Sequence, residues 1–481
     1  MLNYTMINRK TFIKQSGMAA AALALQRFSG FALAPLSGNE FISNRPPLID
    51  RSFTSEAVER TIVAAKNKIK DRELAWMFEN CFPNTLDTTV TTTMKDGRPD
   101  TYVITGDIDA MWLRDSSAQV WPYLPLMKED KKLQNMIAGV VNRHAAYVLV
   151  DPYANAFYND DKRKGHNDDT LMKPGVHERK WEVDSLCYVI RLAHGYWKQS
   201  GDTSCFDNTW LLAMKEIVAT FKNQQRKNDD GAYNFKRNTN QPTDTAAGNG
   251  AGAPIKPVGL ICSVFRPSDD GTVFPFLIPS NYFAVVSLQQ LSEISYTVLK
   301  DKVFGDECMA LANEVAAVLK EHAVVETKHS GKVLAYEVDG YGAHYLIDDS
   351  NVPSLISLPY LSAISVNDAV YKNTRKFLTT FGNQPYYVKG KVAEGTSGPH
   401  AGRDMIWPMG IIIQAMTTSN DAEIKKAIAL LKATHAGTGF MHEAFHKDDA
   451  NNFTRKWFAW ANTLFGEFIL KVLEEKPYLL S

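Results

Sequence analysis

Acidic, aromatic and glycine residues gather in four short stretches of the sequence that lie between apolar segments. Such stretches supply carboxyl groups that exchange protons, beside aromatic faces that pack on sugar rings. Two carboxyl groups on opposite sides of a glycosidic bond can hydrolyse it without a metal or an organic cofactor. The stretches are 105–116, which contains Asp107, Asp109, Trp112, Arg114 and Asp115; 177–184; 265–271, which continues to 278–281; and 437–446.

Simpler explanations exist for single residues in these stretches. Asp115 and Asp184 could be first-turn acids, which interact favourably with the dipole of a helix. Asp269 and Asp270 precede Gly271 and could form a turn. One turn needs a single Asp, however, so Arg, Trp, His and Glu gathered around several turns favour a pocket. The pattern leaves open which two acids act.

The last stretch contains His442-Glu443-x-x-His446, the HExxH pattern of zinc proteases. That chemistry requires both histidines on one turn of a helix, with the glutamate as base. Gly437 and Gly439 precede the pattern and polar residues follow it, so a helix is not predicted there. A zinc metallopeptidase is therefore the weaker alternative, and a non-catalytic glycan-binding protein is another.

Apolar residues recur with a helical period along most of the chain, so helices are expected to position the four stretches. No low-complexity linker divides the chain, which predicts one domain over 35–481. An all-α chain with about twelve helices favours an (α/α)6 toroid, with a pocket built from long loops at one end. The loop 243–253 is expected at that pocket. The expected helices lie within 54–81, 131–150, 181–200, 204–226, 280–299, 302–322, 366–380, 404–417, 421–434 and 454–475, with further helices opening at Ser116 and Pro353 and short hairpins at 332–338 and 386–392.

The composition excludes several classes of protein. Lys and Arg together number 53, as do Asp and Glu, and this zero net charge argues against nucleic-acid binding. Five cysteines without a CxxC pair predict neither a disulfide scaffold nor a cysteine-rich zinc site. The oligomeric state is left open by these features.

The first residues have the layout of an export signal. Arg9, Lys10 and Lys14 precede the short apolar run 17–25, and 32–34 is a small-x-small sequence. The apolar run is too short to span a bilayer, and no other stretch is long enough. We therefore expect an export signal over 1–34, resembling the twin-arginine type, and a periplasmic protein without a transmembrane segment.

The sequence resembles glycoside hydrolase family 125, the exo-α-1,6-mannosidases. The shared motifs are long and follow the family order over nearly the whole mature chain. One departure is Ser350, where a small Ala-like residue is expected. Asp348 and Asp349 precede Pro353 and are expected to order their loop. The motifs are 106–116, 181–185, 265–270 with 278–281, 348–354 and 441–445.

The resemblance implies an (α/α)6 barrel and a metal-independent, inverting enzyme that releases terminal mannose from α-mannosides or N-glycan-type glycans. It assigns Asp270 as general acid and Glu443 as general base, and an inverting pair lies about 6.5–9.5 Å apart. The acid needs a raised pKa, for which Asp269 is the nearest carboxylate in sequence. Arg114 and Asp115 resemble the pair that binds hydroxyls of the terminal sugar, and further expected pocket residues are Asp109, Trp112, Asp184, Asn281 and His400.

Overall fold

The structure is a computed structural model that describes residues 41–481, which cluster as one unit. The export signal expected over 1–34 lies outside the described residues and stays a prediction. Helices dominate the fold, so the helical class is confirmed, although short strands of two to six residues make "all-α" an approximation. Within 41–481 no helix is long and apolar enough to cross a membrane. The helices are α2 (Glu56–Lys68), α3 (Arg72–Cys81), α4 (Asn84–Thr88), α5 (Leu113–Val120), α6 (Lys131–Val150), α7 (Val183–Ser200), α8 (Asn208–Gln224), α9 (Ile278–Ile294), α10 (Lys302–His322), α11 (Ala369–Leu378), α12 (Pro408–Met416), α13 (Asp421–Thr434) and α14 (Ala459–Glu475).

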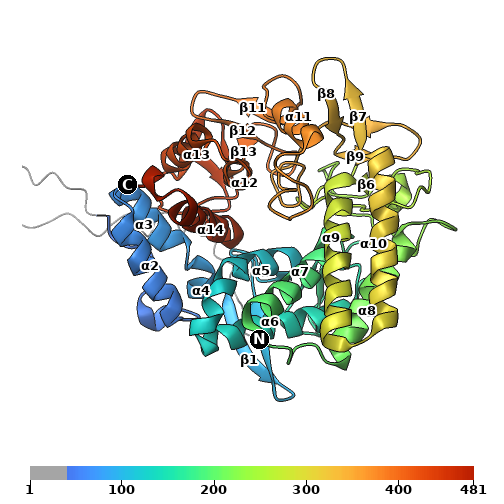
Figure 1. Cartoon of the computed structure of the whole chain (residues 1–481), viewed down its shortest axis with the longest axis horizontal. Coiled ribbons are helices and arrows are strands. Elements are labelled where there is room, and N and C mark those ends of the chain that lie inside the picture. Colours follow the sequence, from blue (N-terminus) through green and yellow to red (C-terminus); the bar gives the residue numbers. More distant parts are fainter. Residues whose placement is uncertain (1–40) are drawn as a thin grey trace, which may run out of the picture. The chain divides into compact units, whose positions relative to one another are not determined.

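Outer and interior segments alternate along the chain (Figure 1). The interior helices pack in the order α12, α14, α5, α7 and α9, while α6, α8, α10 and α13 pack against them from outside. Between α10 and α12 the interior segment 348–362 is a series of turns. The helix expected from Pro353 is therefore absent, because the buried carboxylate of Asp348 accepts the backbone N–H groups of Leu355 and Ile356 and holds a loop. The described chain thus has five interior helices rather than the six of the predicted ring.

The outer and interior helices begin differently. A Ser, Asp or Asn side chain accepts a backbone N–H at the start of each outer helix, as Asp130 does from Leu133 on α6. The five interior helices have no such capping side chain. Groups from elsewhere in the chain accept their first N–H groups instead: Leu113 donates to the carbonyl of Asn155, Ile278 to that of Tyr336 and Ala459 to that of Thr105. The other capping residues are Ser55, Asp71, Asp207, Asp301, Asp368 and Asn420.

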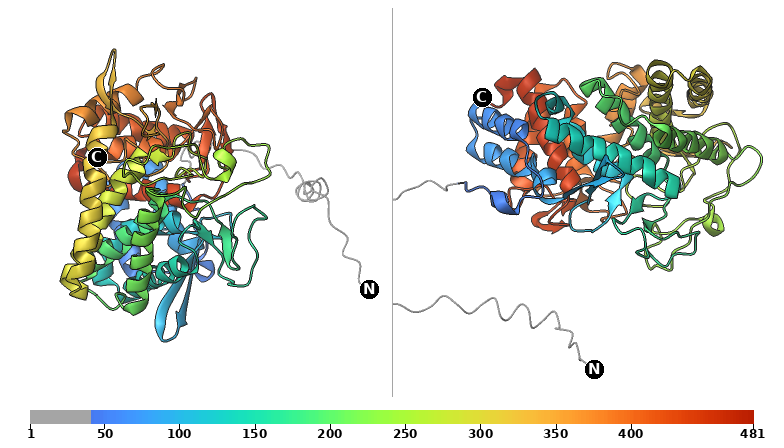
Figure 2. Two further views of the ribbon diagram at one scale, coloured as in Figure 1. Left: turned by 90° about the vertical axis from the view of Figure 1, so that its right-hand side faces the viewer. Right: turned by 90° about the horizontal axis from the view of Figure 1, so that it is seen from below.

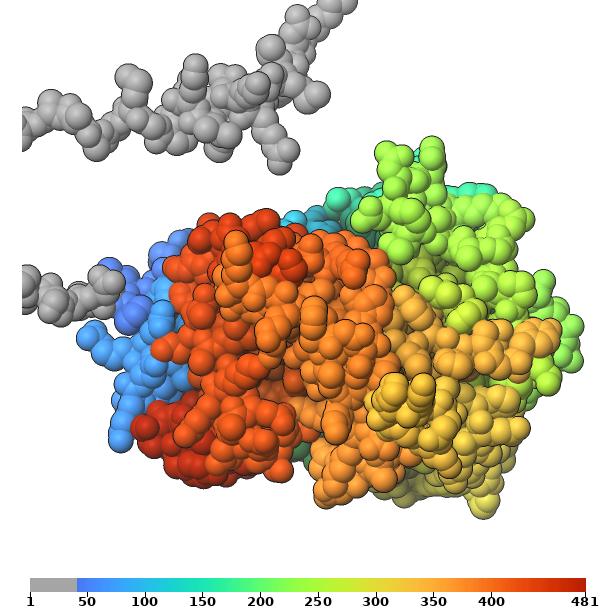
Figure 3. Space-filling view, turned by 90° about the horizontal axis from the view of Figure 1, so that it is seen from above, coloured from blue at the N-terminus to red at the C-terminus, as the bar shows by residue number. Residues whose placement is uncertain are grey.

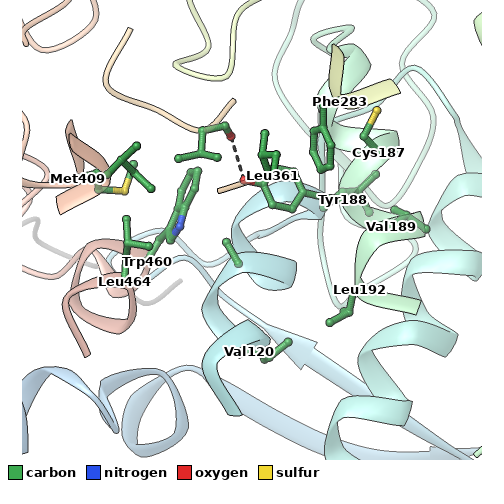
Figure 4. Close-up of a cluster of buried hydrophobic side chains, with 14 of the residues drawn as sticks. Val120, Cys187, Tyr188, Val189, Leu192, Phe283, Leu361, Met409, Trp460 and Leu464 are labelled. Atoms are coloured by element: carbon green, nitrogen blue, oxygen red, sulfur yellow. Dashed lines mark hydrogen bonds between the residues drawn. The ribbon is translucent and has the colours of Figure 1, made fainter. Parts of the chain in front are cut away.

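The core lies where the interior helices meet (Figure 4). Tyr188 on α7 packs edge-on against Phe283 of α9, and its hydroxyl donates to the carbonyl of Val352 at 3.0 Å. This bond ties the loop 348–362 to α7. Leu464 of α14 is also buried in this cluster. Its truncation to alanine is expected to cost about 2–5 kcal/mol of stability.

The strands are short and antiparallel, and several lie beside the interior helix starts. Hairpins do occur near both predicted positions, but with other bounds: β8 pairs with β7 rather than with a strand inside 332–338, and β11 pairs with β12, which lies beyond 392. The hairpin β1–β2 projects from the body of the protein (Figure 2). The strands are β1 (Val90–Lys95), β2 (Arg98–Val103), β3 (Met111–Trp112), β4 (Ala156–Phe157), β5 (Val176–Glu178), β6 (Phe276–Leu277), β7 (Val324–Thr327), β8 (Gly331–Leu334), β9 (Glu337–Val338), β10 (His344–Tyr345), β11 (Tyr387–Lys389), β12 (Glu394–Thr396), β13 (Met405–Ile406), β14 (Ala444–His446) and β15 (Asp449–Thr454).

One predicted helix start is wrong. Ser116 was expected to cap a helix, but α5 begins at Leu113 and already contains Ser116. The Ser116 hydroxyl instead donates to the carbonyl of Trp112 at 2.6 Å, one turn back. The bend expected at Pro122 is confirmed, since α5 gives way to a 3-10 segment, η2 (Trp121–Glu129), at this point.

Candidate active site

A pocket of about 360 Å³ lies at the uncapped starts of α5, α12 and α14. It gathers residues from all four acidic stretches, and the loop 243–253 contributes Asp244, as expected. In Figure 3 the residues around this loop, which are coloured yellow-green, protrude next to the C-terminal segments in orange and red. Side chains in the pocket include Thr105, Trp112, Arg114, Asp115, His177, Glu178, Lys180, Asp244, Asp269, Asp270, His400, Trp407, Glu443, Arg455, Phe458 and Trp460.

Asp270 lies in the wall of this pocket and is 2% exposed. Its pKa is raised to about 6, mainly by burial and also by the Asp349 carboxylate, against the opposing influence of His400. Ser268 connects the two acids: its hydroxyl donates to Asp349 at 2.6 Å and lies 3.3 Å from Asp270. A carboxyl group with such a pKa keeps its proton in mildly acidic solution and can act as a general acid.

Asp269, the expected neighbour, does not raise the pKa of Asp270. Burial favours the neutral form of Asp269, but Lys180 and Arg114 overcome this effect and hold its pKa well below the usual range. Its backbone has φ +65°, a left-handed conformation that is uncommon for a residue other than glycine. That conformation sends adjacent carboxyl groups to different partners: Asp269 to Arg114 at 3.4 Å, and Asp270 to Ser268.

Glu443 reaches the pocket from the segment that precedes β14 and is buried. Its Oε2 accepts a hydrogen bond from Thr454 at 2.9 Å, and its Oε1 lies 3.4 Å from an Arg455 nitrogen. Arg455 is itself fixed by Asp107, at 2.6 and 2.8 Å. These contacts favour a carboxylate at Glu443, which is the form that a general base requires.

The Asp107 loop closes against the chain ahead of α14 through a glycine. Gly106 has φ +129°, and a Cβ atom there would overlap the carbonyl of Trp457. The N–H of Asp107 donates to the same carbonyl at 3.2 Å. Only glycine permits this approach, so Gly106 helps to bring Asp107 to Arg455.

The HExxH pattern does not form the helix that zinc proteases need. Residues 444–446 are strand β14, so His442 and His446 do not share a helical turn. The ring of His442 stacks on Phe453 at 3.6 Å between centroids, and burial lowers its pKa to about 4. Within 41–481 no group of three or more His, Cys, Asp or Glu side chains is arranged to hold a metal ion.

Arg114 is the centre of a buried charge network. Its guanidinium lies 2.6 Å from Glu182, 3.3 Å from Asp184 and 3.5 Å from Asp115. Burial raises the pKa of all three acids, to about 6 for Asp184 and well above the usual range for Glu182. One guanidinium cannot balance several carboxylates in a dry site, so Glu182 is expected to hold a proton. Asp184 therefore supports Arg114 rather than lining the pocket.

Besides Asp184, two further expected pocket residues lie elsewhere. Asn281 is fully buried. Its side-chain oxygen accepts the N–H of Ile261, and its side-chain nitrogen donates to the carbonyls of Ile261 and Leu277, each at 2.9 Å. It joins α9 to the segment around Ile261, so it is corrected to a structural residue. Asp109 points outward and pairs with Arg163 at 2.7 Å, because the loop turns its side chain to solvent. Trp112 and His400 do line the pocket.

Sequence reasoning missed several pocket residues. Lys180 and Glu178 lie in a stretch that was recognised, but only the fold shows that both line the pocket and that Glu182 is buried behind it against Arg114. Arg455 and Trp407 lie outside the four stretches and reach the pocket through strand pairing and an interior helix start. The only feature of the sequence that could have indicated Arg455 and Trp407 is their position next to the start of an apolar segment.

The arrangement is the one that glycoside hydrolysis requires: a carboxyl group with a raised pKa, and a second one held by basic and hydroxyl partners, in an aromatic-lined pocket. A family model described as metal-independent alpha-mannosidase (GH125) matches residues 71–470. The chain belongs to this family, and it is accordingly a glycoside hydrolase of the α-mannosidase type.

Individual relatives agree with this assignment. The Meiotically up-regulated gene 157 protein of Schizosaccharomyces pombe is 41% identical over 91% of this chain and 89% of its own. A metal-independent α-mannosidase structure from Streptococcus pneumoniae, in a non-productive complex with α-1,6-mannobiose, is 40% identical with a TM-score of 0.84, over 88% of this chain and 100% of that one. A bacterial glucoamylase bound to acarbose shares the fold, with 13% identity and a TM-score of 0.52, over 87% of this chain and 59% of that one.

Proposed function

We propose that this protein is an inverting exo-α-1,6-mannosidase that releases terminal mannose from α-mannosides or N-glycan-type glycans. The observation that carries the proposal is the pair Asp270 and Glu443, which share one pocket but have opposite environments. Burial and Asp349 favour the protonated form of Asp270, whereas Arg455 and Thr454 stabilise a carboxylate at Glu443. The α-1,6-mannobiose bound to the Streptococcus pneumoniae relative supports the choice of sugar and linkage.

The reaction would proceed in one displacement. Asp270 donates its proton to the glycosidic oxygen as the bond to the anomeric carbon breaks. A water molecule attacks that carbon from the opposite face, and Glu443 accepts the proton that the water loses. This route inverts the anomeric configuration, and it requires space for the water between the two carboxyl groups, which sets their separation at about 6.5–9.5 Å.

The charged floor of the pocket supports action at a chain end. Arg114 and Asp115 lie side by side at 3.5 Å and both line the pocket, so they can bind neighbouring hydroxyls of one sugar. Their positions are fixed by Glu182 and by the hydroxyl of Thr105. A pocket of about 360 Å³ lies near the lower end of the range for small-ligand sites, which suits a terminal residue better than an internal one.

A time course of α-1,6-mannobiose hydrolysis followed by proton NMR tests the proposal. β-Mannose should be the first anomer released, before mutarotation produces the α form. Initial release of α-mannose would contradict inversion, and faster cleavage of α-1,2- or α-1,3-mannobiose would contradict the linkage. Glu443→Gln is the matched variant, since it keeps the size of the side chain and removes its basicity; full activity of this variant would exclude Glu443 as the base.

A further inference from the structure

A second cavity, of about 940 Å³, lies at the other end of the interior helices. Its floor is formed by Trp121, Arg191, Tyr360 and Glu467, and we call it the Arg191 cavity. Its walls are mostly apolar and come from α2, η2, α12 and α14. The wall residues used below are Ala64, Leu124, Leu126, Met416, Leu470 and Leu473.

The two cavities share three segments of chain. Arg114 and Trp460 line the active-site pocket, and Trp121 and Glu467 line the Arg191 cavity seven residues further along each segment. On α7 the same interval separates Asp184, which contacts Arg114, from Arg191. Seven helical residues correspond to two turns, or about 10 Å. The residues therefore occupy one face of each segment at two levels.

A hydrophobic layer fills the space between these levels. Figure 4 shows Val120, Tyr188, Leu192, Trp460 and Leu464 in this layer. All five side chains are buried. The Arg191 cavity is thus separated from the sugar pocket by packed core.

Arg191 is the unusual feature of this cavity. It is 5% exposed. Its guanidinium carbon lies 3.5 Å from the ring centroid of Trp121, on which it stacks, and 4.9 Å from the ring centroid of Tyr360. No carboxylate of residues 41–481 lies within 4.0 Å of it, although Glu467 is near enough to interact with it electrostatically and the Tyr360 hydroxyl lies beside it. Glu467 instead accepts a hydrogen bond from the Tyr360 hydroxyl at 3.1 Å. A buried guanidinium without a paired anion is costly and calls for a negatively charged partner.

The chemistry of that partner follows from the charge and the walls. A planar guanidinium matches a carboxylate, to which it can donate two parallel hydrogen bonds. The ring face of Trp121 is already covered by Arg191, so a sugar ring cannot stack there. The aliphatic walls favour a hydrocarbon body, and the volume suits a small molecule better than a folded partner.

We propose that the Arg191 cavity binds an apolar carboxylate, which pairs with Arg191 and packs its hydrocarbon chain against Leu124, Leu126 and Leu470. Binding is measured by calorimetry on the full chain with octanoate as probe and with octanamide as its uncharged counterpart. Octanoate should bind at least tenfold more tightly, because only its head group is an anion. Equal affinities, or no binding of either compound, would overturn the proposal.

Two variants examine the two halves of the site separately. Arg191→Met keeps the length of the side chain but not its charge, and should abolish the preference for octanoate over octanamide. Ala64→Trp should weaken the binding of both compounds, because the larger side chain on α2 fills the mouth of the cavity. If Arg191→Met does not fold, this variant alone tests whether the cavity is the binding site. Lys471→Met, which removes a charge at the rim, is the matched control and should keep the octanoate affinity within twofold. Retained octanoate affinity in both Arg191→Met and Ala64→Trp would exclude the cavity as the site, and mannobiose hydrolysis verifies that each variant is folded.

Discussion

Asp270 and Asp349, which are far apart in the sequence, are joined by the single hydroxyl group of Ser268. Burial and the negative charge of Asp349 both raise the pKa of Asp270. A general acid must be protonated, so its activity is lost as the pH rises through that pKa. In the proposed mechanism, the charge at Asp349 therefore extends the active range of the enzyme toward higher pH.

Asp349→Asn should move the alkaline limb of the kcat/KM profile to lower pH, because the pKa of Asp270 falls when its negative neighbour is removed. The profile is measured with α-1,6-mannobiose between pH 4 and pH 8. Asp109→Asn is the control, since Asp109 pairs with Arg163 outside the pocket and should leave the limb in place. A limb that does not move in Asp349→Asn would show that burial alone sets the pKa of Asp270.

Asp270→Asn should lower kcat on α-1,6-mannobiose by about 10²–10⁴-fold, the usual contribution of a general acid. The loss should be much smaller on an aryl mannoside with an acidic phenol, because that leaving group departs without a proton. Comparing kcat for the two substrates in wild type and variant gives the answer. Equal losses on both substrates would contradict the role of Asp270 as acid.

Dialysis against EDTA should leave mannobiose hydrolysis unchanged. In the proposed mechanism Asp270 is the acid and Glu443 the base, and the strand at 444–446 keeps His442 and His446 off a shared helical turn. Activity is measured before and after dialysis, and again after zinc is added. Loss of activity that zinc restores would contradict the proposed mechanism and favour the peptidase-type alternative.

Glu467→Gln should flatten the dependence of stability on pH. Burial raises the pKa of Glu467 from its ordinary value of 4.5 to about 7. The unfolded chain releases the proton first as the pH rises, so stability conferred by the protonated group is lost between about pH 4.5 and pH 7. The variant lacks this loss, which we expect to be on the order of 1–2 kcal/mol because the group is partly exposed. Thermal unfolding across pH 5 to 8 measures it, and Glu474→Gln at the rim should retain the wild-type slope; an unchanged slope in Glu467→Gln would contradict the assigned pKa.

The sequence predicted helices that have a polar face better than the fully buried α5, although the range 54–81 is two helices, α2 and α3, rather than one. The ranges 131–150, 302–322 and 421–434 agree with α6, α10 and α13, because apolar and polar residues alternate with the helical period and a capping residue precedes each helix. In α5 every residue is buried, so no polar face reveals the period, and no capping side chain marks its start. The irregular segment after Asp348 depends on contacts with distant residues such as Tyr188, which a local pattern does not contain.

The sequence predicted those parts of the candidate site that lie within one motif, but not the contacts between residues from different loops. The shared motifs led to Asp270, Glu443 and Arg114, and the fold brings all three into one pocket. Asp269 was the wrong partner for Asp270, because a left-handed residue turns adjacent side chains apart. The effective partner is Asp349, from a different loop. Asn281 is part of a family motif, but it joins α9 to the segment around Ile261 and does not contact the sugar pocket.

The interior helices, whose starts no side chain caps, have a consequence for redesign of the enzyme. Part of the electrostatic potential in the sugar pocket comes from peptide groups, and amino-acid replacement does not remove it. An engineer who exchanges side chains to accept a different sugar therefore works against a constant, weakly positive background. The charge that a new sugar meets in the pocket is then set by the exchanged side chains on top of this unchanged contribution.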